Sequence, residues 1–229
     1  DNRTIKVIDL MNLAPVAVIT GDLVASTRRS AAQVDAAMQA IRDASRTIAG
    51  WHAPPADTRF TRHRGDGWQI VLAAPHHALR AAVVIQARLI ALGMESRMFI
   101  GIGTADTLGT DTLADASGDV FTLSGQGLDD IGNRIRIGFD GSGVSVEDRL
   151  IAELLAERMQ RWTAAQAEAA ALQLASPTRI ATLGEVGKTL NISPQAVNDR
   201  AHGAGSATIA LVLSRWEALK ASKGWGNTE

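Results

Sequence analysis

Two glycine–aspartate pairs beside strand-like runs are the residues of this sequence best suited to chemistry. Asp22 follows Gly21 directly after the β-rich run 16–20, and Asp66 follows Gly65 in a glycine-flanked turn. Carboxylate oxygens are the ligands that hard divalent cations prefer, so the two aspartates would form a metal site if the fold brought them together. Taken singly, each has a simpler explanation as a strand-end cap or a turn residue.

The elements around these pairs follow a recognisable order. Ser30 stands where the N-cap of the first helix is expected. Hydrophobic spacing predicts a strand, a helix, two hairpin strands, a helix and a strand, at 16–20, 31–48, 60–64, 68–72, 76–92 and 97–104. This is the split βαβ order of ferredoxin-like sheets. Right-handed crossovers then place the end of the first strand beside the tip of the hairpin, so we expect Asp22 and Asp66 to converge.

The chain after residue 104 is harder to interpret. The segment 104–121 is rich in Asp, Thr, Gly and Ser, which predicts a loop or short strand leading into 122–134. The segment 134–146 is interpreted as a β-hairpin that turns at Asp140 and Gly141. That hairpin would complete the first domain.

From Glu147 onward the hydrophobic spacing is helical throughout. Helices are expected at 151–159, 163–174, 179–190, 194–202 and 207–220. Thr163 is suited to cap the second of these. The third and fourth are joined by a short turn, with Ser193 as N-cap and Pro194 at the first helical position, which is a helix-turn-helix signature.

The second helix of this pair offers Gln195, Asn198 and Arg200 for contacts with base edges or phosphates of DNA. Asp199 opposes contact with a phosphate backbone, and the surroundings are only weakly basic. The alternative is a module for dimerisation or for docking a partner.

Composition restricts the class of protein. The 229 residues include 23 basic and 24 acidic side chains, so no overall positive field favours nucleic acid. The absence of cysteine excludes disulfides and thiolate chemistry. No apolar run reaches the length of a membrane span, and we expect a soluble cytoplasmic protein. Residues 1–10 precede Met11 and are expected to be an extension without a function of their own.

Three motifs resemble the catalytic domain of class III adenylate and guanylate cyclases. They are GDLVAST at 21–27, RGDGW at 64–68 and GDVFTLSGQGL at 118–128. Together with the helix-turn-helix pattern, the chain resembles the SatD family of bacterial proteins as far as about residue 220. The resemblance implies an α+β protein, with a ferredoxin-like βαββαβ cyclase-type domain at 11–146 and an all-α helix-turn-helix domain at 147–229.

The resemblance also implies ligands and partners. Asp22 and Asp66 match the metal-binding aspartates of the cyclases, with the carbonyl of Leu23 as a backbone ligand to Mg²⁺ or Mn²⁺. Arg62 falls where many cyclases keep a base-reading lysine, and Asp115 falls near the partner aspartate of that lysine. The expected ligand is a nucleoside triphosphate, whose α-phosphate the metals activate for in-line attack. Because class III sites are shared across a head-to-tail dimer, a homodimer is expected.

The third motif departs from the family. It places Thr122 at the asparagine that orients the ribose and Gln126 at the arginine that stabilises the transition state. A glutamine cannot make the charged bidentate contact of a guanidinium, so turnover would need Arg134 or Arg136 to supply the charge. The sequence therefore favours a weakly active cyclase or a non-catalytic nucleotide sensor. The competing hypothesis is a DNA-binding transcriptional regulator whose first domain senses a ligand or dimerises.

Overall fold

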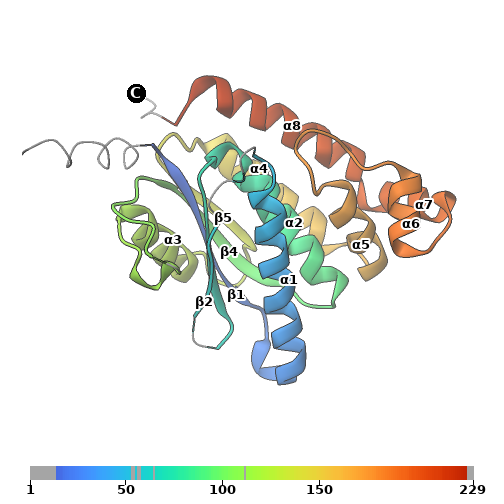
Figure 1. Cartoon of the computed structure of the whole chain (residues 1–229), viewed down its shortest axis with the longest axis horizontal. Coiled ribbons are helices and arrows are strands. Elements are labelled where there is room, and N and C mark those ends of the chain that lie inside the picture. Colours follow the sequence, from blue (N-terminus) through green and yellow to red (C-terminus); the bar gives the residue numbers. More distant parts are fainter. Residues whose placement is uncertain (1–13, 53–54, 56–57, 64, 111, 226–229) are drawn as a thin grey trace, which may run out of the picture.

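A five-stranded sheet lies at the centre of the computed structural model, which describes residues 14–52, 55, 58–63, 65–110 and 112–225 (Figure 1). The segment 1–10 lies outside the described residues. The strands are β1 (Val16–Leu23), β2 (Phe60–Arg62), β3 (Gly67–Leu72), β4 (Ser96–Gly103) and β5 (Ile137–Gly141).

The strand order is β2-β3-β1-β4-β5. β1 runs antiparallel to both of its neighbours, β3 and β4, whereas β5 runs parallel to β4. The first four strands, with the helix after β1 and the helix after β3, therefore have the predicted split βαβ order. A mixed fold of helices and strands is confirmed.

Helices cover both faces of this sheet. They are α1 (Ala31–Ala49), α2 (Ala78–Ala91), α3 (Asp119–Asp130), α4 (Val146–Gln160), α5 (Ala164–Gln173), α6 (Leu183–Leu190), α7 (Pro194–Ala204) and α8 (Ser206–Lys223), with short 3-10 turns η1 (Ser26–Arg28), η2 (Pro75–His77) and η3 (Leu113–Asp115). The predicted N-caps are confirmed, because Ser30, Thr163 and Ser193 each accept a hydrogen bond from the backbone three residues ahead.

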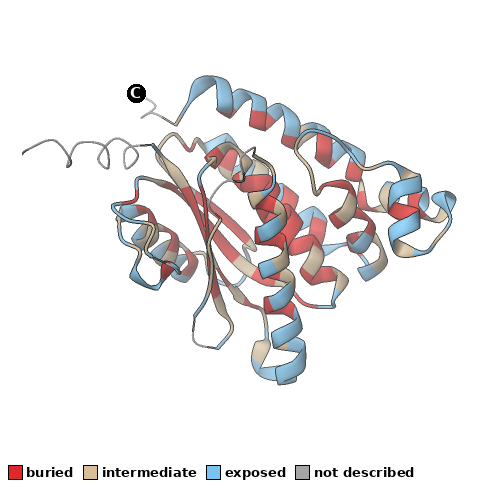
Figure 2. Ribbon diagram, in the orientation of Figure 1, coloured by how far each residue is buried: buried red, intermediate tan, exposed pale blue. Residues whose placement is uncertain are grey.

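Alternate side chains of β1 point into two separate clusters, as the period of a strand requires. Ile19 packs into the main core with α1 and α2, whereas Val18 faces α3 and packs with Val120. Helix α2 lies at the centre of the molecule and is buried along most of its length (Figure 2). The sheet is therefore the middle layer between α3 and the α1–α2 pair (Figure 1).

The predicted hairpin at 134–146 is wrong. Only β5 forms there, parallel to β4, and the chain then turns into α4 with Ser145 as its N-cap. Gly141 occupies a left-handed conformation with φ 123°, and a Cβ on it would lie 2.1 Å from the carbonyl oxygen of Ile102. This glycine therefore allows close approach of two backbones and does not form a hairpin turn.

The loop or short strand predicted at 104–121 is confirmed as far as residue 118 among the described residues, with η3 and an isolated bridge between Thr107 and Ser117. No helix was predicted at 122–134, whereas α3 spans 119–130. Its glycines lower helix propensity and weaken the periodic signal. One of them has a packing role: a Cβ on Gly127 would lie 2.4 Å from the ring of Phe99 on β4. Glycine is needed at this position because α3 packs closely against β4.

The C-terminal helices lie where helices were predicted. α4, α5 and α8 pack against the α2 side of the sheet and extend the main core, whereas α6 and α7 share a small cluster with α5 built on Ala169, Val186 and Val197. The division at 146/147 stays a prediction. Among the described residues, no helix combines the length and the apolar character needed to cross a membrane.

Candidate functional site

The two glycine–aspartate pairs meet at one end of the sheet. Asp22 lies opposite Gly67 in the β1–β3 ladder, and the backbone N–H of Leu23 donates to the carbonyl of Asp66 at 3.2 Å. Gly21 leaves room for the indole of Trp68, because a Cβ there would lie 2.5 Å from the ring. The predicted convergence of Asp22 and Asp66 is confirmed.

A buried chain of hydrogen bonds fixes the backbone of Asp22. The indole N–H of Trp68 donates to Ser96 Oγ at 3.0 Å, and that hydroxyl lies 2.6 Å from the carbonyl oxygen of Asp22. Trp68 and Ser96 are both fully buried. The carboxylate of Asp22 is therefore carried on a backbone held from both neighbouring strands.

A hollow of about 310 Å³ opens in front of the two carboxylates. Its lining combines acidic, basic and hydroxyl groups: Asp22, Leu23, Val24, Ala25, Ser26, Thr27, Asp66, Arg97, Asn133 and Arg136. Both charge signs thus line one open cavity, which is the composition that a metal–phosphate ligand requires.

Arg97 forms a two-point contact with Asp22. Its Nε lies 3.1 Å from Oδ1 and its Nη2 lies 2.5 Å from Oδ2, while Nη1 donates to the carbonyl of Gly132 at 3.1 Å. The hydrogen bond with Asp22 raises the pKa of Arg97 above its ordinary value, and the charges of Asp22, Asp129 and Asp66 act in the same direction. The pair is partly exposed to solvent.

Ser26, Asp66 and Arg136, which also line the hollow, have partners as well. Ser26 donates its hydroxyl hydrogen bond to Asp66 Oδ2. Arg136 contacts Glu95 at 3.2 Å and donates to the carbonyl of Asn133. Asp66 thus has an uncharged hydrogen-bond partner, whereas Asp22 has a cationic one.

The donor set fits a hard divalent cation of a particular kind. Among the described residues no three His, Asp or Glu side chains gather closely enough to hold a metal ion. Mg²⁺ is commonly bound through one or two carboxylates, with water and substrate phosphates completing its shell. Asp22 and Asp66 fit that pattern, because they supply two carboxylates and leave the remaining positions to water and phosphate.

Arg62 and Leu23 lie beside these carboxylates in different ways. The guanidinium of Arg62 pairs with Asp35 at 2.8 Å, and both line a second hollow of about 390 Å³. This hollow shares Ser26, Thr27 and Asp66 with the first. The side chain of Leu23 is buried in the main core, so only its backbone faces the site.

Three other predicted site residues do not line either hollow. Thr122 and Gln126 are exposed on α3. Asp115 lies on η3 and accepts hydrogen bonds from the backbone and hydroxyl of Thr110, which lower the pKa of Asp115 below its ordinary value. The single chain does not bring these residues to Asp22 and Asp66.

The predicted DNA-contact residues lie on α7. Asn198 is exposed, Gln195 donates to Asp199 at 3.1 Å, and Arg200 pairs with Glu168 of α5 at 2.9 Å. Gln195 and Arg200 therefore make intramolecular contacts.

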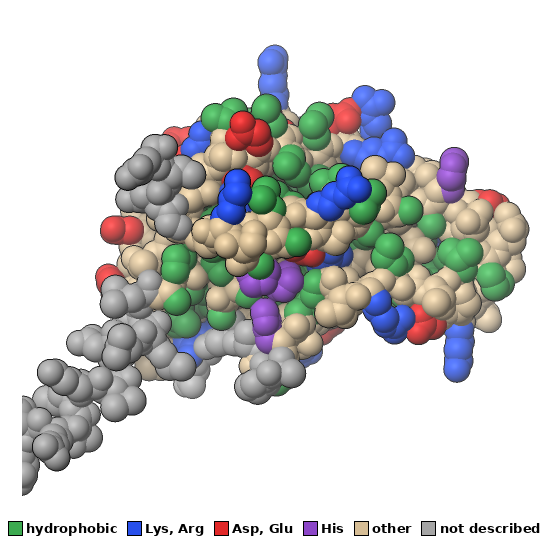
Figure 3. Space-filling view, turned by 90° about the horizontal axis from the view of Figure 1, so that it is seen from above, with side chains coloured by type: hydrophobic (Ala, Val, Ile, Leu, Met, Phe, Trp, Pro, Cys, Tyr) green, Lys and Arg blue, Asp and Glu red, His purple; other side chains and the backbone are tan. Residues whose placement is uncertain are grey.

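Histidines gather at a different place (Figure 3). The rings of His52 and His76 lie 5.4 and 4.2 Å from the ring of His77. Burial lowers the pKa values of His52 and His76, and the charge of His77 lowers them further. None of the three lines the hollow at Asp22.

Two residues of the hollow were missed from the sequence. Arg97 begins a strand predicted for other reasons, and it faces Asp22 only because the β1–β4 register pairs the two positions. Ser26 stands in the motif at 21–27 without a role of its own, and its bond to Asp66 depends on the path of η1. The strand register that places Arg97 and the loop path that places Ser26 are not visible in the sequence.

The comparisons with known proteins return structures alone. No family model and no curated protein matches the chain. The catalytic core of a rhodopsin-guanylyl cyclase with converted specificity is 19% identical with a TM-score of 0.39, covering 52% of this chain and 73% of that one.

Two further solved structures are similar at the same level. A bacterial light-regulated adenylyl cyclase is 12% identical with a TM-score of 0.41, covering 66% of this chain and 81% of that one. The active GGEEF domain of a diguanylate cyclase from Vibrio cholerae is 16% identical with a TM-score of 0.35, covering 55% and 83%. At these identities and TM-scores, the similarities support no conclusion about the activity of this chain.

Proposed function

We propose that the hollow at the end of β1 binds a nucleoside triphosphate together with Mg²⁺ or Mn²⁺, as in a divergent class III cyclase-like protein of the SatD kind. The observation that supports this most is the meeting of Asp22 and Asp66 in one open cavity that is also lined by Arg97 and Arg136. Carboxylates suit the cation, and guanidinium groups suit phosphate oxygens.

Each residue has a distinct role in this proposal. Asp22 and Asp66 hold the cation, with the carbonyl of Leu23 as a further oxygen ligand. Arg97 and Arg136 balance the charge of the phosphates. The bound cation polarises the phosphoryl oxygens, which is the chemistry it supplies. In this proposal Arg62, which lines the adjoining hollow, contacts the nucleotide base.

The proposed protein is a weak cyclase or a sensor of nucleotides. Thr122 and Gln126 replace the groups that orient ribose and stabilise transition-state charge, and neither lines the hollow of its own chain. A homodimer with a shared site would bring α3 of one copy toward the cavity of the other. Even there, an uncharged glutamine cannot replace an arginine.

Calorimetry with Mn²⁺ and each of the four nucleoside triphosphates tests binding. We expect the wild type to bind at least one of them and Asp66→Ala to bind at least about tenfold more weakly, a loss of about 1.4 kcal/mol. Asp199→Ala removes an exposed carboxylate on α7 and is the matched control, with unchanged affinity. A wild type that binds no nucleotide, or an Asp66→Ala protein that binds as well as the wild type, would refute the site.

A product assay separates the two forms of the proposal. Mass spectrometry of each triphosphate incubated with protein and Mn²⁺ would detect a cyclic nucleotide and pyrophosphate from a weak cyclase. If the protein binds nucleotide but forms neither product, it is a nucleotide sensor and not a cyclase.

One feature favours a second candidate function, a transcriptional regulator that reads DNA. α6 and α7 are joined by a short turn with Asn191 in the left-handed conformation, Ser193 as N-cap and Pro194 at the first helical position. Gel shifts with DNA from the gene's own promoter test it. A salt-dependent shift that is lost in Asn198→Ala supports this function, and the lack of any shift counts against it.

A further inference from the structure

Arg97 is tied to the candidate metal ligand by the sheet itself. It is the cross-strand partner of Asp22 in the antiparallel β1–β4 ladder, so strand pairing holds the two side chains together. Two of its nitrogens contact the two oxygens of the Asp22 carboxylate, and a third contacts the carbonyl of Gly132 in the loop after α3. The guanidinium thus occupies the oxygens that a metal ion would use.

We propose that Arg97 is a specificity-determining residue of this site: it acts as a tethered cation that holds Asp22 in the ligand-free protein and moves onto the phosphates when a divalent cation takes its place. This inference rests on the proposed function, and it assigns to Arg97 the task of making metal binding depend on the nucleotide.

The chemistry of a guanidinium suits both positions. Its planar fork makes bidentate contacts with carboxylates and with phosphates alike, and it keeps its charge at any physiological pH. A bare divalent cation at Asp22 would meet this fixed positive charge at short range, where like charges repel strongly. A cation that arrives with a triphosphate brings anionic oxygens onto which the guanidinium can transfer.

The neighbouring charges single out Arg97 for this task. Arg136, the second arginine of the hollow, is engaged by Glu95. Asp66 accepts a hydrogen bond from the neutral hydroxyl of Ser26. Arg97 is therefore the cation that contacts a candidate ligand directly, and its removal changes the charge beside Asp22 itself.

The first half of the proposal is that Arg97 competes with a divalent cation for Asp22. Titration of the full chain with Mn²⁺ alone, monitored by electron paramagnetic resonance, tests it. We expect Arg97→Gln to bind Mn²⁺ about tenfold more tightly than the wild type, because the competing cation is gone. Arg97→Lys keeps the charge and should stay within about threefold of the wild type. Arg149→Gln breaks another Arg–Asp pair, with Asp140 at 2.6 Å, outside the hollow, and should leave Mn²⁺ binding unchanged.

The second half is tested with a non-hydrolysable triphosphate analogue at saturating Mn²⁺. Arg97→Gln should bind the analogue about tenfold more weakly than the wild type, since it lacks the phosphate contact. Thermal melts show whether each variant is folded. If Arg97→Gln is not, Arg97→Met, which also lacks the charge, is measured in its place with the same expected results.

The possible outcomes separate this inference from the function on which it rests. Equal or weaker Mn²⁺ binding by Arg97→Gln, or unchanged binding of the analogue, overturns the role of Arg97 while the metal site stands. If neither the wild type nor Arg97→Gln binds Mn²⁺ or the analogue, the proposed function and this inference both fail.

Discussion

At the scale of single residues, Gly21 sets the geometry of the candidate site. The position is buried in the centre of the sheet, and a Cβ on it would lie 2.5 Å from the indole of Trp68 and 2.8 Å from the carbonyl oxygen of Arg97. The glycine lets the indole lie against β1 next to Asp22. Gly21 thus shapes the site by leaving space for Trp68, although it contacts no ligand.

We predict that Gly21→Ala lowers the free energy of unfolding by about 1–3 kcal/mol, the usual cost of overpacking a filled core. Urea denaturation measures this change. Gly125→Ala is the matched control: its Cβ would meet nothing within 4 Å, and in a helix interior alanine is favoured over glycine by about 0.5–1 kcal/mol. If Gly21→Ala and Gly125→Ala had the same free energy of unfolding, the indole of Trp68 would not pack tightly against position 21.

Single residues of the site differed in how far they could be predicted. Asp22 and Asp66 stand out because glycine–aspartate pairs at strand ends are visible as short motifs. Arg97 is invisible at that level, because only the β1–β4 register shows that it faces Asp22. Charged pairs across a ladder depend on register, and no hairpin turn joins β1 to β4 to fix that register locally.

At the scale of elements, a few neighbouring residues determine where a helix begins. Helix α6 begins with a capping box in which Thr182 and Glu185 exchange hydrogen bonds, and Arg179 contacts the same Glu185 carboxylate at 2.9 Å. The hydrogen bond from Arg179, followed by those from Thr182, lowers the pKa of Glu185 to about 2 from an ordinary value of 4.5. Glu185 is exposed to solvent, so these direct contacts, and not burial, cause the shift.

We predict that carbon-13 NMR titration of the Glu185 side chain gives a midpoint near pH 2 in the wild type. Because the folded pKa is depressed, the contacts stabilise the helix start above pH 4.5 and are lost as the pH falls toward 2. Arg179→Gln should raise the midpoint, and Lys188→Gln, a change in the last turn of the same helix, should not. A wild-type midpoint near 4.5 would contradict the capping geometry.

Elements with regular hydrophobic spacing were predicted, and elements built on glycine were not. The helices at 31–49 and 78–91 follow the pattern read from the sequence. Helix α3 was not predicted, and strand β5 was predicted as one half of a hairpin, because Gly127, Gly138 and Gly141 allow close packing but resemble turn residues in the sequence. A tertiary contact decided their structure, and the local preference of the chain did not.

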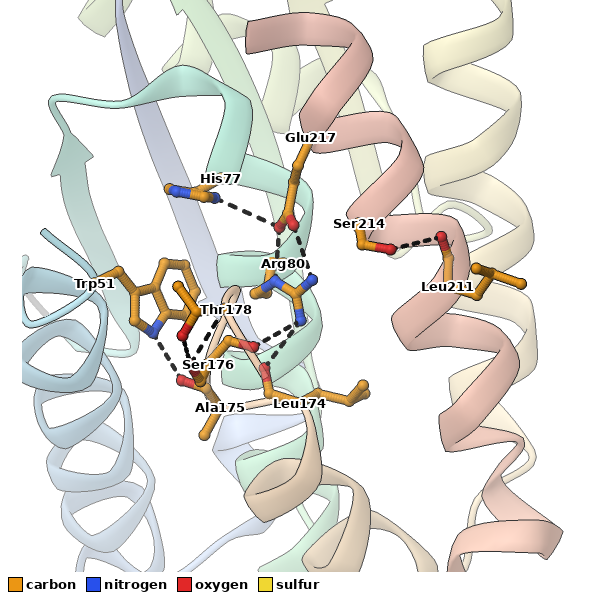
Figure 4. Close-up of polar contacts among 10 residues, drawn as sticks. All are labelled: Trp51, His77, Arg80, Leu174, Ala175, Ser176, Thr178, Leu211, Ser214 and Glu217. Atoms are coloured by element: carbon orange, nitrogen blue, oxygen red, sulfur yellow. Dashed lines mark hydrogen bonds and ion pairs between the residues drawn. The ribbon is translucent and has the colours of Figure 1, made fainter. Parts of the chain in front are cut away.

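At the scale of the whole molecule, one buried ion pair connects the helix behind the sheet to the last helix. Arg80 of α2 contacts Glu217 of α8 at 2.6 and 2.8 Å and also donates to the carbonyls of Leu174 and Ser176 (Figure 4). His77 lies 3.5 Å from the same carboxylate. Burial favours a raised pKa for Glu217, but the close approach of His77 and the hydrogen bonds from Arg80 hold it below its ordinary value.

We predict that Glu217→Gln lowers the free energy of unfolding by about 3–5 kcal/mol, because it leaves the buried charge of Arg80 uncompensated. The double variant Arg80→Met/Glu217→Leu should recover most of this loss, since apolar replacements remove both charges. Glu157→Gln breaks an exposed pair with Arg161 and should cost less than about 1 kcal/mol. Chemical denaturation measures all three. A small effect of Glu217→Gln would mean that this ion pair contributes little to holding α8 against α2.

The arrangement of the whole molecule was only partly visible in the sequence. The order of the first four strands followed from the succession of elements and from crossover handedness. The packing of α4, α5 and α8 against α2 did not, because contacts such as Arg80 with Glu217 join residues far apart in the chain. Helical spacing shows which face of a helix is apolar but not which surface that face covers.

The central claim is that Asp22 and Asp66 hold a divalent cation together with a triphosphate. A crystal structure of the full chain grown with Mn²⁺ and a non-hydrolysable triphosphate analogue tests it most directly, because manganese gives an anomalous signal. We predict a manganese peak within coordination distance of both carboxylates, with the phosphates in the same hollow and Arg97 on a phosphate oxygen. Manganese and nucleotide absent from this hollow, with Arg97 still on Asp22, would contradict the claim.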